Sequence, residues 1–382
     1  MTVKPFTINI PQTTLDDLRE RLAYTRWPDE VDGAGWDYGT NLGYLKELVA
    51  YWQQDFDWRA QEAKLNQFAQ FRAEIDGLGI HFIHERGKGP SPLPIVLTHG
   101  WPDSFYRMHK IIPLLSDPAR HGGDPTDSFD VIVPSVPGYG FSDRPRQRGI
   151  TSKRTAELWA RLMTGALGYT RFGAAGGDVG SEVTLHLAHT HPSLLAGIHL
   201  TDVSYPMAPP EGVEASEDAQ RYFEALHHWF SQEGAYMMLQ STKPQTLVYG
   251  LNSSPAGLAA WMVEKFRAWS DCAGDIERRF SKDELLTNIM IYWATETITS
   301  STRMYHENMH APARLWPAPR IDVPVGVAHF NDLVPPRAWV ERAMNLQRWT
   351  EMPRGGHFAA LEEPELFVED LRTFFRPLRA VN

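Results

Sequence analysis

The sequence predicts an α/β protein with a mostly parallel central sheet, because short apolar runs alternate with helical segments. The runs that indicate strands are 93–102, 129–145 and 195–204, and each ends in glycine, proline or polar turn residues. Nearly continuous apolar strands of this kind are typical of a parallel sheet that helices cover on both faces.

A block of helices interrupts this pattern after Pro206. Within the block, Ser254 is a favoured helix cap and Pro255 suits the first helical position, and the apolar residues that follow recur at helical spacing. Strand signals return at 323–330. We therefore expect the helical block to be an insert, a lid, in an α/β core.

The N-terminal part of the chain shows signals for a helix and for a hairpin. Thr14 and Asp17 form the pattern of a capping box at the start of a helix. Apolar and polar residues then alternate within 71–87, where Asp76-Gly77 marks a hairpin turn. We expect four parts in chain order: an N-terminal segment with the first hairpin at 1–90, the core at 91–205, the helical lid at 206–318, and the second part of the core at 319–382.

Composition narrows the class of protein. The chain of 382 residues carries a net charge of −10, which argues against a surface for nucleic acid or for an anionic membrane. Its single cysteine, Cys272, cannot form an internal disulfide, which fits a reducing compartment. No apolar run approaches the roughly 18 residues that span a bilayer. We expect a cytoplasmic protein without a membrane anchor, and secretion by an unrecognised route is left open.

The stretch Gly176-Gly177-Asp178-Val179-Gly180 has the small-x-nucleophile-x-small form of the nucleophile elbow in the α/β-hydrolase fold. In such a turn the strand bends sharply into a helix and exposes the nucleophile at the carboxyl end of the sheet. Two other interpretations are a plain helix cap, since aspartate is a favoured cap, and a phosphate-binding turn. A following Lys-Ser/Thr pair is absent from the sequence, which weakens the phosphate interpretation.

Two residues farther along the chain complete the order that such hydrolases require. Asp332 follows the strand signal at 323–330, and His357 lies in the glycine-flanked stretch "RGGHF". Nucleophile, acid and histidine therefore occur in the expected sequence order. Each residue could instead be an ordinary loop residue, but order, spacing and strand-end placement agree jointly.

An oxyanion hole is expected beside the nucleophile. The stretch His99-Gly100-Trp101-Pro102 comes directly after a strand. In serine hydrolases the loop at this position gives one backbone N–H, and the residue after the nucleophile gives the other. We therefore expect Trp101 and Val179 to supply the two donors, with a tight aromatic turn as the alternative.

An aspartate nucleophile suits displacement at a saturated carbon. A serine would form an ether there, whereas an aspartate forms an ester that water can open. His357 would activate that water and Asp332 would stabilise the imidazolium. Such an enzyme attacks either a carbon that bears halide or an epoxide.

The leaving group separates these two substrates. Halide is often held by an indole directly after the nucleophile, and this chain has Val179 there. An epoxide oxygen needs a proton donor, and a tyrosine stays protonated at neutral pH. Tyr236 and Tyr305 in the lid are candidates, although composition does not separate them from the other lid tyrosines Tyr222, Tyr249 and Tyr292.

The chain resembles the soluble branch of the microsomal-type epoxide hydrolases over nearly its whole length. The stretches that carry the resemblance include "PFTINIPQTTLDDLRERLAYTRWPDE", "HGWPDSFYRM", "PSVPGYGFSD", "GGDVGS", "QSTKPQT", "LLTNIMIYW" and "RGGHFAALEEPE". The sequence departs from the family at Val179, where many members have tryptophan. Membrane-bound members also carry an N-terminal anchor, whereas this chain starts at the wrapping segment, so membrane attachment is not implied.

The resemblance implies an α/β-hydrolase fold whose N-terminal region wraps the core. It implies Asp178 as nucleophile, Asp332 as acid and His357 as base. It further implies Tyr236 and Tyr305 as the lid acids and Trp101 as an oxyanion donor. The implied partners are a small lipophilic epoxide and water, with no cofactor, and a homodimer is left open.

Rival functions are a haloalkane or haloacid dehalogenase with the same nucleophile and a non-catalytic receptor with a hydrolase fold. The intact set of nucleophile, acid, base and oxyanion loop disfavours the receptor. The histidines of "LHLAHTHP" suggest a metal site, but cysteine or acidic ligands do not frame them. We therefore expect no metal: the three residues are His186, His189 and His191.

Overall fold

The computed structural model describes residues 1–203, 206, 208–209, 216–311 and 319–379 of the chain. One nine-stranded sheet forms its centre, with the strand order β1-β2-β3-β5-β4-β6-β7-β8-β9. The strands are β1 (Val3–Pro5), β2 (Gln70–Ile75), β3 (Leu78–Glu85), β4 (Leu93–Thr98), β5 (Phe129–Pro134), β6 (Phe172–Gly176), β7 (Leu195–Leu200), β8 (Ile321–His329) and β9 (Met344–Glu351).

The sheet has an antiparallel edge and a parallel remainder. Strand β1 pairs antiparallel with β2, β2 with β3, and β3 with β5. From β5 to β9 all neighbours are parallel. The α/β-hydrolase fold expected from the sequence is therefore confirmed.

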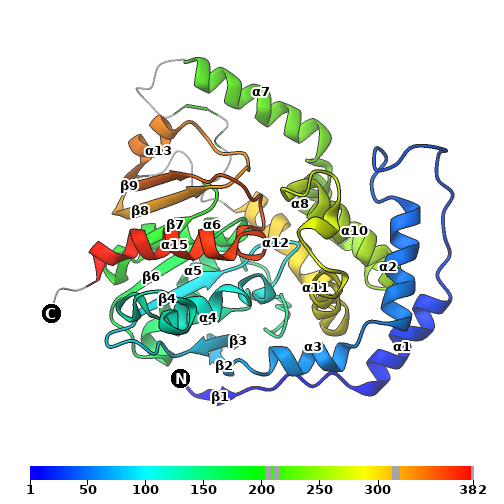
Figure 1. Cartoon of the computed structure of the whole chain (residues 1–382), viewed down its shortest axis with the longest axis horizontal. Helices are drawn as coiled ribbons and strands as arrows, with labels where there is room; N and C mark the ends of the chain where they lie inside the picture. The colour runs from blue at the N-terminus through cyan, green and yellow to red at the C-terminus, as the bar shows by residue number, and fades with distance from the viewer. Residues whose placement is uncertain (204–205, 207, 210–215, 312–318, 380–382) are drawn as a thin grey trace.

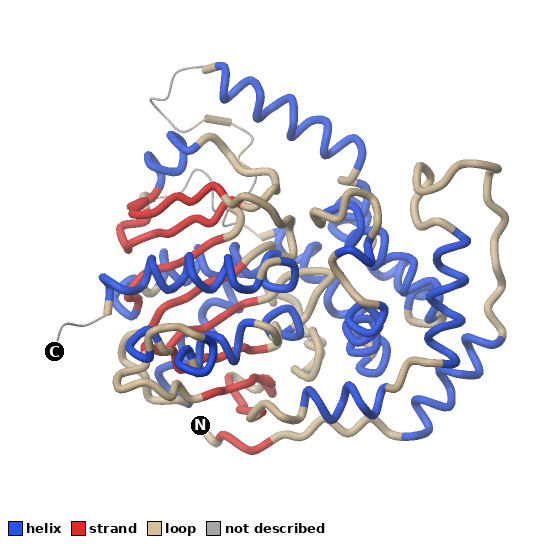
Figure 2. Tube along the Cα trace, in the orientation of Figure 1, coloured by secondary structure: helices blue, strands red, loops and turns tan. Residues whose placement is uncertain are grey.

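Helices cover both faces of the sheet. Helices α4 and α15 lie on one face and α5 and α6 on the other (Figures 1 and 2). The inner strands are buried on both sides: every residue of β5, β6 and β7 is buried. The helices of the core are α4 (Ile111–Ser116), α5 (Ser152–Arg161), α6 (Val179–Thr190), α13 (Arg337–Ala343), α14 (Ala359–Glu362) and α15 (Pro364–Phe375).

The lid lies between β7 and β8 in the chain. Its helices are α7 (Glu217–Gln232), α8 (Ala235–Thr242), α9 (Pro244–Leu251), α10 (Pro255–Trp269), α11 (Lys282–Thr295) and α12 (Ile298–His310). Helix α10 begins where the sequence predicts, because the Ser254 side chain accepts the N–H of Gly257 and Pro255 takes the first position. The lid therefore stands above the carboxyl ends of the parallel strands, where β6 and β7 end.

The N-terminal segment leaves the sheet edge, passes along the lid and returns to the sheet (Figure 1). Its helices α1 (Gln12–Ala23), α2 (Leu42–Gln54) and α3 (Trp58–Leu65) contact α10 and α11 of the lid. The predicted hairpin turn is present, because Asp76 and Gly77 both have positive φ between β2 and β3. The predicted cap at Thr14 is wrong: α1 begins earlier, at Gln12, after Pro11 sets the turn without a side-chain cap.

Candidate active site

The elbow between β6 and α6 holds Asp178 in a strained conformation. Asp178 has φ of +59°, and it is the residue directly before the first turn of α6. A side chain at Gly176 would clash with the carbonyl oxygen of Gly180, and one at Gly180 would clash with that of Thr98. The glycines are therefore required by the close approach of α6 to β4 and β6, and the strain presents Asp178 at the strand end.

The two expected oxyanion donors hold one oxygen of Asp178. The N–H of Trp101 donates to Oδ1 at 2.8 Å and the N–H of Val179 donates to the same oxygen at 2.7 Å. A Cβ at Gly100 would strike the Asp178 side chain, so the loop after β4 can approach this closely only with glycine there. The structure thus brings together the nucleophile and both donors named from the sequence.

The residues expected as acid and base meet beside the expected nucleophile. His357 Nδ1 lies 2.7 Å from Asp332 Oδ2, and His357 Nε2 lies 3.6 Å from Asp178 Oδ2. Nε2 is buried and makes no hydrogen bond within the described part of the chain, so it is oriented only toward the nucleophile side. His357 is fixed through its backbone, because its N–H donates to the carbonyl of Trp269 at 2.9 Å.

The lid places both tyrosines over the oxyanion loop. The ring of Tyr236, on α8, stacks on Trp101 with centroids 5.2 Å apart, and the ring of Tyr305, on α12, meets the same indole edge-on at 6.0 Å. The two tyrosine rings lie 6.0 Å from each other. Trp269 closes the far side, with its ring 5.1 Å from Tyr236 and 5.2 Å from His357.

Opposing charges set the ionisation of the site. Burial alone would lower the pKa of His357, but the carboxylates of Asp332 and Asp178 outweigh it and raise that pKa to about 9. Burial raises the pKa of Asp178 above its ordinary value, although the His357 imidazolium and the two N–H donors oppose the rise. Burial would also raise the pKa of Asp332, but the charge and the hydrogen bond of His357 keep the pKa of Asp332 below its ordinary value.

Burial also determines the direction in which the pKa values of the two lid tyrosines shift. The pKa of Tyr236 and the pKa of Tyr305 both lie well above the ordinary value, first because the side chains are desolvated and then because the Asp178 carboxylate is near. Both phenols are therefore neutral at physiological pH. A neutral phenol can hydrogen-bond to a substrate oxygen and then donate its proton.

Comparison with known proteins decides the family. The model described as epoxide hydrolase N terminus matches residues 3–108, and the model of the α/β hydrolase fold matches residues 94–235. A relative from Stigmatella aurantiaca, named as an epoxide hydrolase, is 47% identical over 99% of this chain and 86% of its own length. This chain belongs to the epoxide hydrolase family. The resemblance found in the sequence is thus confirmed, and the protein is an enzyme that hydrolyses epoxides.

Other epoxide hydrolases agree in sequence and fold. Epoxide hydrolase 1 of Sus scrofa is 38% identical over 98% of this chain and 88% of its own length. The crystal structure of juvenile hormone epoxide hydrolase from Bombyx mori superposes with a TM-score of 0.90 at 28% identity, covering 99% of this chain and 95% of that one. The Aspergillus niger epoxide hydrolase gives 0.87 at 31% identity, covering 99% and 97%.

Among the residues that the structure describes, no helix of this epoxide hydrolase combines the length and the apolarity that a membrane span requires.

The sequence did not reveal all the polar groups of this epoxide hydrolase site. Asp202 accepts the backbone N–H of Asp178 at 2.5 Å, and burial followed by the nearby Asp332 raises the pKa of Asp202 to about 7. Its position directly after β7, at the carboxyl edge of the sheet, is the signal that could have found it. Asp202 therefore holds the strained backbone of Asp178.

A buried ion pair contacts the backbone of His357. Arg107 donates to Asp103 Oδ2 at 2.7 Å and to the carbonyl oxygen of His357 at 2.5 Å, and both charged side chains are almost fully buried. Asp103 in turn accepts the N–H of Gly100 at 2.7 Å. The pair thus joins the oxyanion loop to the histidine loop, and nothing in the sequence pattern marked it.

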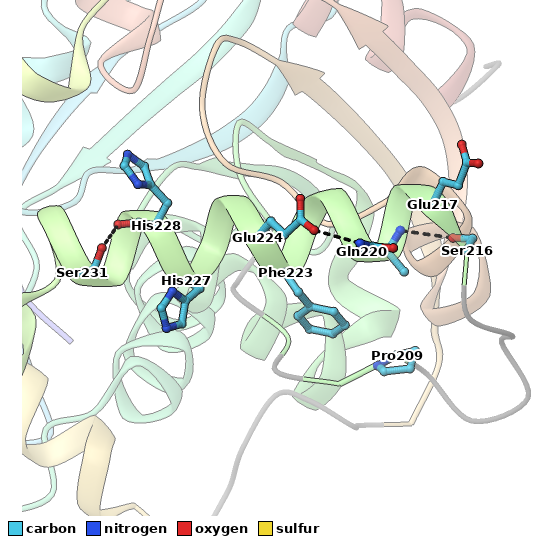
Figure 3. Close-up of a pocket in the computed structure, with 10 residues that line it drawn as sticks. Pro209, Ser216, Glu217, Gln220, Phe223, Glu224, His227, His228 and Ser231 are labelled. Carbon is cyan, nitrogen blue, oxygen red and sulfur yellow. Dashed lines mark hydrogen bonds between the residues drawn. The ribbon is translucent and has the colours of Figure 1, made fainter.

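A separate surface pocket of about 800 Å³ lies along α7 (Figure 3). Its walls include Phe223, His227 and Pro209. The lining contains neither Asp178 nor His357, so within the described residues this pocket is distinct from the catalytic centre.

Proposed function

We propose that this epoxide hydrolase opens its substrate through a covalent ester on Asp178, which water activated by His357 then hydrolyses. The observation that carries the proposal is the different surroundings of the two Asp178 oxygens. Oδ1 accepts two backbone N–H groups, whereas Oδ2 faces His357 Nε2 at 3.6 Å. Oδ1 is therefore placed to be the carbonyl oxygen of an ester and Oδ2 to be the attacking atom.

In the first step, Oδ2 attacks one carbon of the epoxide ring. The bond from that carbon to the ring oxygen breaks, and the oxygen takes a proton from Tyr236 or Tyr305. Both phenols are neutral because burial raises their pKa well above the ordinary value. The product is a hydroxyalkyl ester of Asp178 and one tyrosinate.

In the second step, esterification has removed the negative charge of Asp178. That charge helps to raise the pKa of His357 in the free enzyme to about 9, so the pKa of His357 falls once the ester forms. The imidazolium then gives its extra proton to the tyrosinate, which becomes neutral again. The neutral imidazole can then take a proton from a water molecule whose oxygen attacks Cγ of Asp178, while Asp332 stabilises the imidazolium.

The tetrahedral intermediate carries its negative charge on Oδ1, which the N–H groups of Trp101 and Val179 receive. The bond from Cγ to Oδ2 then breaks, and the diol leaves with Oδ2 and a proton from His357. Hydrolysis of the ester to a carboxylate releases one further proton, which restores the imidazolium of His357. Asp178 keeps one oxygen from water.

The substrate class follows from the surrounding side chains. The rings of Trp101, Tyr236, Tyr305 and Trp269 surround the nucleophile, and Val179 adds an aliphatic wall. Such surroundings favour a small lipophilic epoxide, with water as the second reactant. Styrene oxide is therefore a suitable probe.

The test separates the two steps with His357→Gln. Asp178 can still attack without the base, so intact-mass spectrometry after mixing with styrene oxide should show protein plus one epoxide. His121→Gln makes the same change at an exposed position and should turn over normally without an adduct. Normal turnover by His357→Gln, or no adduct while Asp178 is present, would refute the role of His357 in ester hydrolysis.

A further inference from the structure

Three polar side chains from three helices meet beside the catalytic centre. Ser152 of α5 donates its hydroxyl to Glu182 Oε2 on α6 at 2.8 Å. Asn308 of α12 donates its Nδ2 to the same Glu182 oxygen at 3.1 Å and to the Ser152 hydroxyl at 2.8 Å. The Asn308 Oδ1 accepts the backbone N–H of Ser152 at 2.9 Å. We call these three residues the Glu182 clamp.

The clamp lies close to two catalytic groups in sequence and in space. Glu182 lies in the first turn of α6, and its N–H donates to the carbonyl oxygen of Asp178 at 3.3 Å. Asn308 follows Tyr305 by three residues, so these two share a face of α12. Burial raises the pKa of Glu182 to about 7, and the negative charge of Asp178 adds to that rise. The clamp therefore joins the helix of the nucleophile to the helix of a lid acid.

Other contacts of α12 lead elsewhere. Among the helices, α12 packs chiefly against α8 and α9, both in the lid. Arg303 donates to the carbonyl of Pro145 at 3.0 Å, and Glu307 accepts the N–H of Gly149 at 2.7 Å, but both partners lie in a loop of the core. Between the described residues of α12 and α6, the hydrogen bond from Asn308 to Glu182 is the direct polar link.

We propose that the Glu182 clamp sets the position of the Tyr305 hydroxyl relative to Asp178 and thereby determines the rate of epoxide ring opening. The proposal rests on the proposed function, in which Tyr305 is an acid for that step. Proton transfer and attack must occur together on one small ring, and a misplacement of about 1 Å can cost on the order of 100-fold in rate. Glu182, Ser152 and Asn308 are thus positioning residues, whose effect passes through Tyr305.

The test exchanges the amide of Asn308 and the carboxylate of Glu182 within the clamp. Asn308→Asp leaves no N–H to donate and sets a second carboxylate against Glu182. Single-turnover mixing with styrene oxide should then show ester formation slowed about tenfold, with ester hydrolysis unchanged. Glu182→Gln combined with Asn308→Asp restores one amide facing one carboxylate, and ester formation should recover to within about threefold of the wild-type rate.

Two controls establish that the effect is specific. Glu157→Gln makes the same chemical change on α5, at an ion pair with Arg154 outside the clamp, and should leave both steps unchanged. In a Tyr305→Phe background, Asn308→Asp should cause no further slowing, because the clamp acts through the Tyr305 hydroxyl. If Asn308→Asp does not fold, Ser152→Ala, which removes only the bridging hydroxyl, must slow ester formation selectively.

The outcomes distinguish this inference from the function on which it rests. If Tyr305→Phe itself forms the ester at the wild-type rate, the acid role in the proposed function is wrong. If Tyr305→Phe is slow but Asn308→Asp is not, or if the exchanged pair does not recover, the clamp does not position Tyr305. Equal slowing of both steps by Asn308→Asp would also overturn the inference, because general loosening of the site would produce it.

Discussion

The two lid helices that carry the proposed acids, α8 with Tyr236 and α12 with Tyr305, are held in different ways. Helix α12, with Tyr305, is fastened to the core by hydrogen bonds, since Arg303 and Asn308 reach Pro145 and Ser152. Toward the core, helix α8 relies instead on packing between rings, since Tyr236 stacks on Trp101 at an interplanar angle of 7°. Its polar link is within the lid, where His306 Nδ1 of α12 lies 3.0 Å from the carbonyl oxygen of Ser241. Gln240 of α8 is buried with no partner for its side-chain amide among the described residues.

The difference teaches how one site can place two similar donors. Hydrogen bonds are directional and short, so they fix the position of α12 against the core. Ring stacking fixes the plane of Tyr236 but tolerates sliding along the indole. We therefore expect Tyr305 to depend on polar contacts and Tyr236 to depend on the oxyanion tryptophan itself.

The comparison between the two lid helices assumes that both tyrosines donate to the substrate oxygen, and removal of their hydroxyl groups tests this. Tyr236→Phe and Tyr305→Phe should each lose about 1–3 kcal/mol of transition-state stabilisation, because each removes one hydrogen bond to the developing alkoxide. The double variant should lose about 2–6 kcal/mol, a fall in ring-opening rate of up to about four orders of magnitude. Stopped-flow or quenched single-turnover measurements with styrene oxide give these rates.

Phenylalanine in both positions preserves the aromatic packing, so unfolding monitored by circular dichroism serves as the control and should change little. An active double variant would mean that another group protonates the alkoxide, and the roles given to both lid helices would be wrong.

A smaller effect is expected from the stacking itself. Trp101→Leu retains the backbone N–H and removes the ring on which Tyr236 stacks, and loss of this fully buried side chain should destabilise the fold by about 3 kcal/mol. In a double-mutant cycle, Trp101→Leu and Tyr236→Phe should couple by about 0.5–1.5 kcal/mol in ring opening, and Trp101→Leu and Tyr305→Phe by less. Coupling of equal size for both tyrosines would remove the distinction between stacked and hydrogen-bonded placement.

The smallest effect is expected when the pH is changed. This experiment tests whether another group, instead of the tyrosines, donates the proton in ring opening. The imidazolium of His357, with its pKa raised to about 9, is a second acid close to the nucleophile. If the tyrosines donate, ring opening should change by less than about threefold as pH rises through 9, since their pKa values lie well above the ordinary 10. If His357 donates, ring opening should instead fall about tenfold per pH unit above 9.

Ester hydrolysis provides the internal comparison in the same experiment. It requires neutral His357, so its rate should rise with pH until the lowered pKa of the ester form is passed. A hydrolysis rate that falls with rising pH would contradict the role of His357 as base.

The sequence predicted those parts of the enzyme that local rules determine. The elbow around Asp178 requires glycines at fixed positions, and Asp332 and His357 each follow a strand, so pattern and order indicated where these residues lie. The start of α1 was missed because Pro11 begins the helix without the side-chain cap that the pattern at Thr14 suggested.

The choice among tyrosines could not be made from pattern, because it depends on packing. Tyr249 is 73% exposed, Tyr222 packs against Trp339, and Tyr292 donates its hydroxyl to the carbonyl of Asp103 at 2.5 Å. Only the folded lid directs Tyr236 and Tyr305 to Trp101. The Glu182 clamp could not be predicted from the sequence for the same reason, since its members come from three helices.

The central claim is that Asp178 attacks carbon and is itself attacked by water, and the first-turnover origin of the product oxygen tests it most directly. Enzyme in excess is mixed with styrene oxide in ¹⁸O-labelled water for one turnover. We expect an unlabelled diol, because its new oxygen comes from Oδ2, and a gain in mass of the peptide that contains Asp178. Label in the first-turnover diol, with an unlabelled peptide, would contradict the covalent mechanism.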